Sequence, residues 1–146
     1  MCRKMTHVEA ASRLYEKGIR PSPQRIAVWE YVRSNPIHPT ADQVYCALSP
    51  DMPSLSKTTV YNSLKQLVEA GFLATVNIEN DELRYDGNTE RHYHFKCLKC
   101  GKIFDIPARN GFLIPDMPED FTVQEIQTNI WGICCVCNKP YGSEQK

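Results

Sequence analysis

The chain has 146 residues with seven cysteines and four histidines, and its 17 basic side chains balance its 17 acidic ones. This length allows one ordinary domain or two small ones. No apolar run is long enough for a membrane span or a signal peptide, so we expect a cytoplasmic protein with reduced thiols that act as ligands rather than disulfides.

The zero net charge is unevenly distributed. Residues 1–75 carry nine Lys/Arg against six Asp/Glu, whereas residues 76–146 carry eight against eleven. A basic front half and an acidic rear half suggest nucleic-acid contact in the first part and cation binding in the second.

Two helices are predicted at the start of the chain. The first, over residues 7–17, ends at Gly18. Its apolar side chains at helical spacing are Val8, Ala11, Leu14 and Tyr15. The second begins after Ser22 as N-cap, with Pro23 in the first helical position. Its apolar face consists of Ile26, Val28, Trp29 and Val32.

Two more helices follow. Thr40 and Gln43 form a predicted capping box that opens a short helix ending near Leu48. Ser56 caps a longer helix over residues 57–70. A short helix, a turn and a longer helix have the outline of a helix-turn-helix.

A β-hairpin is expected directly after these helices. Residues 72–78 and 83–86 are rich in strand-forming side chains, and a polar turn at 79–82 separates them. Such a hairpin occupies the place of the wing in a winged helix. DNA binding is therefore predicted for the front half, with a plain helical bundle as the alternative.

The rear half contains two groups of cysteines. Cys97 and Cys100 form one Cys-x-x-Cys pair, and Cys134, Cys135 and Cys137 offer a second. Two such pairs give the tetrahedral sulfur environment that zinc prefers. A disulfide or a thioredoxin-like redox motif is the alternative, which the missing βαβ context disfavours.

Two histidines lie just before the first cysteine pair. On a strand, His92 and His94 leave the same face, whereas Cys97 leaves the other. One ion cannot easily collect both sets, so a second metal site is predicted. The alternative is a pair of exposed strand histidines.

These blocks together resemble the ferric uptake regulator (Fur) family, most closely its peroxide-sensing (PerR) branch. The matching blocks are residues 18–25, 38–42 and 56–64, His92-Tyr93-His94 and the two Cys-x-x-Cys pairs. The resemblance implies an α+β bacterial homodimer, with a winged-helix DNA-binding domain over residues 1–86 and a small α/β dimerisation domain over residues 87–146. It also implies a structural zinc and a regulatory Fe(II) or Mn(II) that closes the dimer onto double-stranded operator DNA.

The resemblance also implies which residues bind. The structural zinc falls to Cys97, Cys100, Cys134 and Cys137. The regulatory ion falls to His38, Asp86, His92, His94 and Asp105. For DNA, the resemblance implies a base-contacting tyrosine at Tyr61. Lys57, Asn62 and Lys65 are expected to contact DNA because they lie on the same predicted helix. A two-residue gap favours Cys134 over Cys135 as the partner of Cys137, because both thiolates then reach one ion from a tight turn. Three imidazoles and two carboxylates suit Fe(II) or Mn(II) better than four-coordinate zinc.

Two features favour the peroxide-sensing branch. Asp105 matches that branch, where iron-uptake members typically carry Glu. The extra His/Glu-rich site of many iron-uptake members is missing, because residues 124–127 read Gln-Glu-Ile-Gln. The resemblance then implies a transcriptional repressor that senses hydrogen peroxide through Fe(II)-catalysed oxidation of His38 or His92.

Other readings remain open from the sequence. An iron- or manganese-responsive repressor of metal-uptake genes is the nearest rival, ahead of a zinc- or nickel-responsive one. A metallohydrolase is more remote, because no nucleophile elbow, His-Glu-x-x-His motif or phosphate loop is present. A zinc-stapled interaction module without DNA binding is a further alternative.

One segment departs from the family pattern. Residues 106–120, where the family usually has a helix, are interrupted by Pro107, Pro115 and Pro118.

Overall fold

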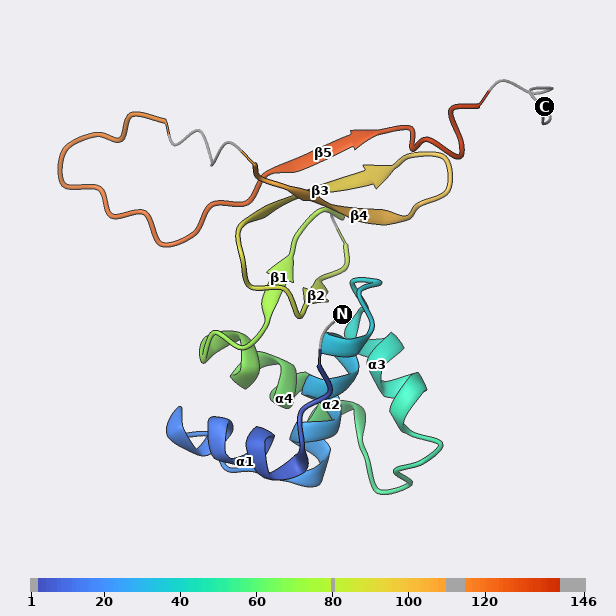
Figure 1. Cartoon of the computed structure of the whole chain (residues 1–146), viewed down its shortest axis with the longest axis vertical. Helices are drawn as coiled ribbons and strands as arrows, with labels where there is room; N and C mark the ends of the chain where they lie inside the picture. Colours follow the sequence, from blue (N-terminus) through green and yellow to red (C-terminus); the bar gives the residue numbers. More distant parts are fainter. Residues whose placement is uncertain (1–2, 80, 110–114, 140–146) are drawn as a thin grey trace. The chain divides into compact units, whose positions relative to one another are not determined.

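The computed structural model describes residues 3–79, 81–109 and 115–139. The chain divides into two compact units, Met1–Thr89 and Glu90–Lys146. The first contains four helices and a hairpin, and the second a three-stranded sheet (Figure 1). This is the α+β arrangement predicted from the sequence.

The helices of the first unit begin and end close to the predicted positions. They are α1 (His7–Glu16), α2 (Pro23–Ser34), α3 (Ala41–Leu48) and α4 (Lys57–Glu69). Ser22, Thr40 and Ser56 cap α2, α3 and α4 as expected, each accepting a hydrogen bond from the backbone N–H three residues on. Polar side chains at the caps satisfy backbone donors that a helix start leaves without partners.

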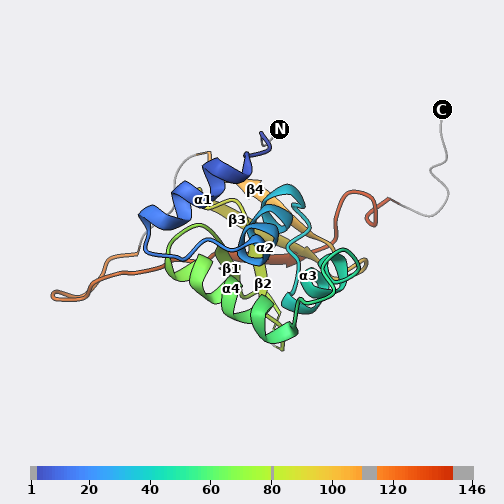
Figure 2. The same ribbon diagram turned by 90° about the horizontal axis from the view of Figure 1, so that it is seen from below.

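The core of the first unit forms around α2, which lies between α1 and α3 (Figure 2). Its Trp29 ring lies 4.6 Å from the ring of Phe72, and Arg13 from α1 covers the Trp29 ring at 5.3 Å. Val28, Leu64 and Leu67 are fully buried. The predicted apolar face of α2 is buried throughout.

The apolar side chains that indicate α1 in the sequence differ in burial. Val8 and Tyr15 are 78% and 77% exposed, whereas Ala10 and Leu14 are buried. The helix lies at the edge of the unit, so only a narrow stripe at i and i+4 meets its neighbour.

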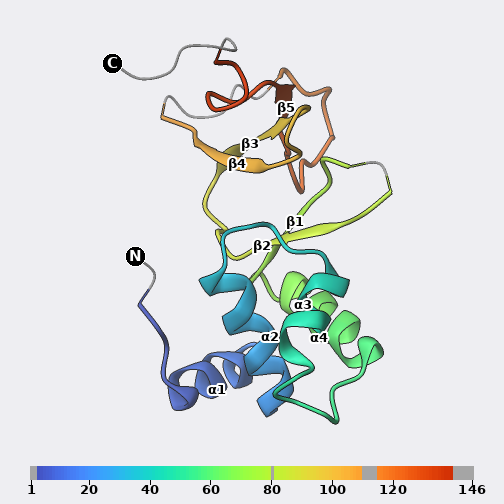
Figure 3. The same cartoon turned by 90° about the vertical axis from the view of Figure 1, so that its right-hand side faces the viewer.

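The hairpin consists of β1 (Ala74–Val76) and β2 (Arg84–Asp86), paired antiparallel with Ala74 opposite Asp86. It lies at the C-terminal end of α2 (Figure 3). Strand β1 is shorter than the predicted run 72–78. The reason is that the backbone N–H groups of Phe72 and Leu73 both donate to the Leu67 carbonyl and so complete the end of α4.

The second unit is a sheet in the order β4-β3-β5. Strand β3 (His92–Cys97) pairs antiparallel with β4 (Ile103–Pro107) and parallel with β5 (Asn129–Gly132). Within the described residues of this unit there is no helix. Of the proline-interrupted segment 106–120, residues 110–114 lie outside the described residues. In the part of the chain that the structure describes, no helix has the length and apolar character of a membrane span.

Candidate metal centres and nucleic-acid surface

Four cysteines converge in the second unit. Cys97 ends β3, Cys100 follows in the turn before Gly101, and Cys134 and Cys137 lie in the turn after β5. Their sulfur atoms all lie within 4.8 Å of one another. A tetrahedron with Zn–S bonds of about 2.3 Å has S–S edges of about 3.8 Å. The distance from Cys100 Sγ to Cys134 Sγ is 3.8 Å, so the donor set fits a zinc ion.

Backbone donors prepare this cluster for a cation. The backbone N–H groups of Cys100 and Cys134 point at Cys97 Sγ, at 3.5 and 3.3 Å. These hydrogen bonds, the one from Cys100 first, lower the pKa of Cys97 to about 6. The hydrogen bond with the Cys134 thiol and burial raise the pKa of Cys137 to about 12. Without a metal ion, Cys97 thus favours the thiolate and Cys137 the protonated thiol. A dication at the centre of the cluster would hold both as thiolates, because metal binding deprotonates coordinating thiols.

The other described cysteines do not belong to the cluster. Cys135 is exposed, although it lies next to Cys134. Cys46 is exposed on α3 of the first unit. The structure therefore brings together the four cysteines of the expected zinc set and separates Cys135 from them.

A second set of ligands lies on β3 and β4. His94 is directly opposite Asp105 in the register, and His92 is two residues earlier on the same strand. Asp105 Oδ1 lies 3.1 Å from His92 Nε2 and 3.5 Å from His94 Nε2, and the two Nε2 atoms are 2.9 Å apart. Ligand atoms around one ion stand roughly 3 to 3.4 Å apart when each bond is about 2.1 Å. The three side chains can therefore share one cation.

The imidazole of His92 has a defined orientation. Its Nδ1 lies 2.6 Å from the Glu90 carbonyl oxygen. A carbonyl can only accept, so this contact requires the proton on Nδ1 and directs the Nε2 lone pair toward His94 and Asp105. This is the tautomer that a metal ligand needs.

The first unit contributes a buried histidine and carboxylate. His38 is 2% exposed and Asp86 4% exposed, and His38 Nε2 lies 3.5 Å from Asp86 Oδ2. The backbone N–H of Asn88 donates to Asp86 Oδ1 at 2.8 Å. Both predicted ligands of this unit thus lie together, on the loop before α3 and at the end of β2.

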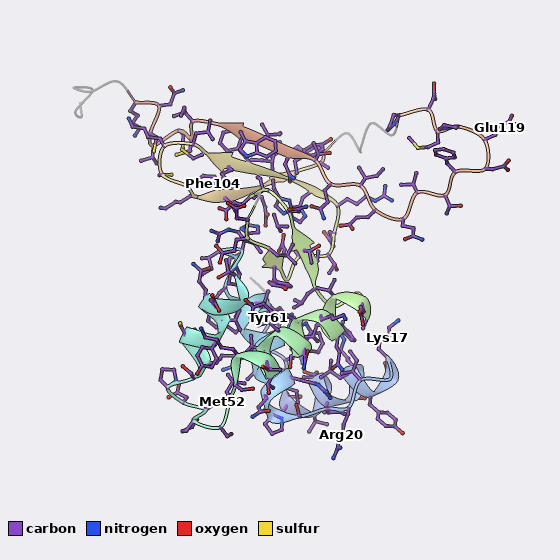
Figure 4. All side chains as sticks on the ribbon, turned by 180° about the vertical axis from the view of Figure 1, so that it is seen from behind. Lys17, Arg20, Met52, Tyr61, Phe104 and Glu119 are labelled. Atoms are coloured by element: carbon purple, nitrogen blue, oxygen red, sulfur yellow. The ribbon has the colours of Figure 1, made fainter. Side chains whose placement is uncertain are left out.

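The predicted DNA-contacting residues share the exposed side of α4. Lys57, Tyr61, Asn62 and Lys65 are all exposed, whereas Val60, Leu64 and Leu67 face the core. The Tyr61 side chain projects from this helix (Figure 4) and is 50% exposed. Tyr61, Asn62 and Lys65 line an open groove of about 430 Å³ together with Leu83 and Tyr85 of the hairpin region. A core role for Tyr61 is excluded.

The sequence prediction missed the residues that orient two of the candidate metal ligands, Asp86 and His92. Asn88 and Glu90 contact Asp86 and His92 through backbone groups. The turn-forming sequence Asp86-Gly87-Asn88 was an available signal for the first contact, because Asp side chains often accept from the N–H two residues on. Nothing in the sequence pointed to the second.

A helical DNA-binding unit with a hairpin, followed by a sheet with a four-cysteine cluster, defines a metal-binding transcriptional regulator. The model of the ferric uptake regulator family matches residues 16–111. The peroxide-responsive repressor PerR of Staphylococcus aureus is 39% identical over 132 residues, which cover 88% of this chain and 89% of that protein. The chain belongs to the ferric uptake regulator family.

Solved structures agree with this assignment. The structure of PerR from Streptococcus pyogenes, which addresses peroxide sensing and gene regulation by that protein, is 32% identical to this chain with a TM-score of 0.52. The match covers 90% of this chain and 92% of that chain. The Helicobacter pylori ferric uptake regulator Fur shares the fold with a TM-score of 0.69 at 20% identity, over 96% of this chain and 99% of its own. The protein is a metal-dependent repressor of this family rather than an enzyme, so the metallohydrolase reading is wrong.

Proposed function

We propose that the protein is a peroxide-sensing repressor in which one Fe(II) or Mn(II) ion joins His38 and Asp86 of the first unit to His92, His94 and Asp105 of the second. The observation that carries the proposal is the convergence of His92, His94 and Asp105 on one point. His38 and Asp86 add a buried imidazole and a carboxylate of the same chemical kind. Five nitrogen and oxygen donors suit Fe(II) or Mn(II).

The four-cysteine cluster has a separate, structural role in this proposal. A zinc ion bound by Cys97, Cys100, Cys134 and Cys137 would tie the end of β3 to the turn after β5. The second unit has a small apolar core, with exposed Trp131, Ile133 and Val136 around its last strand. A closed four-ligand site contributes folding free energy to a unit of this size.

An ion held by both ligand sets would connect the two units. Its binding would favour the arrangement of the units that fits operator DNA, and loss of a ligand would release that arrangement. When bound, Fe(II) would catalyse the oxidation of one of its histidine ligands by hydrogen peroxide. A ring C–H of His38 or His92 would become C–OH with one peroxide oxygen, the other oxygen would leave as water, and the oxidised imidazole would be a poorer donor.

DNA recognition is assigned to α4 and its exposed side. Lys57 and Lys65 supply attraction to phosphates, whereas Tyr61 and Asn62 contact base edges in the major groove of double-stranded operator DNA. A cytoplasmic homodimer would read two half-sites, since a two-fold protein matches a palindromic operator. The 39% identity with PerR of Staphylococcus aureus, named as a peroxide-responsive repressor, supports a repressor function for this chain.

Mass spectrometry of metal-loaded protein after brief peroxide exposure tests the proposal. With Fe(II), one oxygen should be added to the peptide containing His38 or His92, and DNA should be released in a parallel gel-shift assay. With Mn(II), which does not readily reduce peroxide, neither change should occur. Metal-dependent DNA binding without histidine oxidation would instead indicate an iron- or manganese-responsive repressor of uptake genes.

A further inference from the structure

The loop that carries His38 has an unusual backbone. His38 has φ = +54°, in the left-handed region that side chains other than glycine rarely adopt. A residue stays in such a conformation only where its surroundings hold it there. Strand β2 supplies the contacts that hold it.

Backbone pairing joins the loop to β2. The Tyr85 N–H donates to the Pro39 carbonyl at 3.0 Å, and Thr40 forms an isolated antiparallel bridge with Arg84. Thr40 in turn caps α3. The residues after His38 are thus fixed on both sides, by the strand and by the helix start.

The Arg84 side chain completes the contact at His38 itself. Its Nη1 donates to the His38 carbonyl oxygen at 3.0 Å. The opposite edge of the guanidinium faces Glu79, with Nη2 donating to Oε1 at 3.2 Å and Nε 3.2 Å from Oε2. The Arg84 and Glu79 side chains are 18% and 17% exposed, so solvent screens this pair less than an exposed one.

Arg84 and Asp86 act on His38 from the same strand. Being two residues apart on β2, they leave the same face of the strand. Arg84 bonds the backbone of His38, and Asp86 lies 3.5 Å from its imidazole. Displacing the Arg84 contact should therefore move the imidazole relative to the carboxylate that shares its proposed ion.

We propose that Arg84, oriented by Glu79, is a positioning residue that holds His38 in the geometry required for the regulatory metal. Arg84 touches no metal in this scheme and acts only through the His38 backbone. The inference rests on the proposed function, because it assumes that His38 is a ligand. Groups that orient a metal ligand typically change metal affinity by about 10–100-fold when they are removed.

The test measures Mn(II) affinity by electron paramagnetic resonance titration of the zinc-loaded full chain, without DNA. Arg84→Lys keeps the charge but loses the fork that bonds Glu79 and the His38 carbonyl together. Its Mn(II) affinity should fall by about 10–100-fold. Glu79→Gln, a milder change, should lower the affinity in the same direction and carries the test if Arg84→Lys does not fold.

Arg25→Lys is the matched control. Arg25 Nη1 also donates to a backbone carbonyl, that of Arg20, at 2.6 Å, in the same unit. This contact does not involve His38, so Mn(II) affinity should stay unchanged. Zinc content and thermal unfolding of the Mn-free proteins are measured for every variant, to compare only folded chains.

A double-mutant cycle with His38→Ala separates the possible failures. If Arg84 acts through His38, then Arg84→Lys should have no further effect on Mn(II) affinity in the His38→Ala protein. An equal loss in both backgrounds would overturn the inference, as would unchanged affinity in Arg84→Lys and Glu79→Gln. Unchanged affinity in His38→Ala alone would instead refute the proposed metal site.

Discussion

Cys134 Sγ lies 3.8 Å from Cys100 Sγ, whereas the neighbouring Cys135 is exposed and outside the cluster. Cys134→Ser should therefore abolish stoichiometric zinc binding and destabilise the second unit. Cys135→Ser should retain one zinc per chain. Zinc content by metal analysis and thermal unfolding provide the readout. Equal zinc loss in both variants would contradict the assignment of Cys134.

Substitutions on the exposed side of α4 should affect DNA binding in two different ways. Lys65→Ala should weaken binding to every duplex and make it less dependent on salt, because a phosphate contact is lost. Tyr61→Ala should mainly reduce the difference between operator and random DNA. Tyr61 is 50% exposed, so its removal should leave thermal stability nearly unchanged. Fluorescence anisotropy at several salt concentrations distinguishes the two effects.

Two apolar residues of α1 should differ sharply in their contribution to stability. Leu14 is fully buried, so Leu14→Ala should lower the free energy of unfolding by about 2–5 kcal/mol. Val8 is 78% exposed, and Val8→Ala should change it by no more than about 0.5 kcal/mol. Urea denaturation of the metal-loaded proteins measures both. A large effect of Val8→Ala would contradict this prediction and show that the Val8 side chain is buried in solution.

Local signals predicted most of the first unit. Ser22, Thr40 and Ser56 are caps whose side chains bond the nearest backbone, so adjacent residues suffice to recognise them. Burial on α1 could not be predicted in this way, since it depends on where α2 lies. The apolar arc of α1 contains more side chains than its neighbour covers.

The same distinction applies to the candidate sites. The Cys-x-x-Cys spacing and the His-x-His spacing are local sequence patterns. The structure brings the four cysteines together in one cluster and His92 and His94 together in another. Arg84 and His38 are 46 residues apart, and their contact arises only when β2 pairs beside the loop. Positioning groups of this kind carry no motif, because they act through a backbone carbonyl that every residue possesses.

The last prediction concerns Asp105, whose Oδ1 is close to both His92 and His94. A carboxylate one methylene longer can still reach the ion, so Asp105→Glu should retain Mn(II)-dependent DNA binding. The altered ligand geometry should slow histidine oxidation when the Fe(II)-loaded protein meets peroxide. Gel-shift assays and mass spectrometry of the peptides containing His38 and His92 give the two readouts.

Cysteine chemistry offers a competing explanation for peroxide sensitivity. Cys97 and Cys100 could be oxidised with loss of zinc, which would also release DNA. In that case DNA release would be equally fast with Mn(II), and oxygen would be found only on the cysteine peptides. If the His/Asp site is the sensor, histidine oxidation should occur only in the Fe(II)-loaded protein. It should also be slower in Asp105→Glu, because Asp105 belongs to the His/Asp site and not to the cysteine cluster.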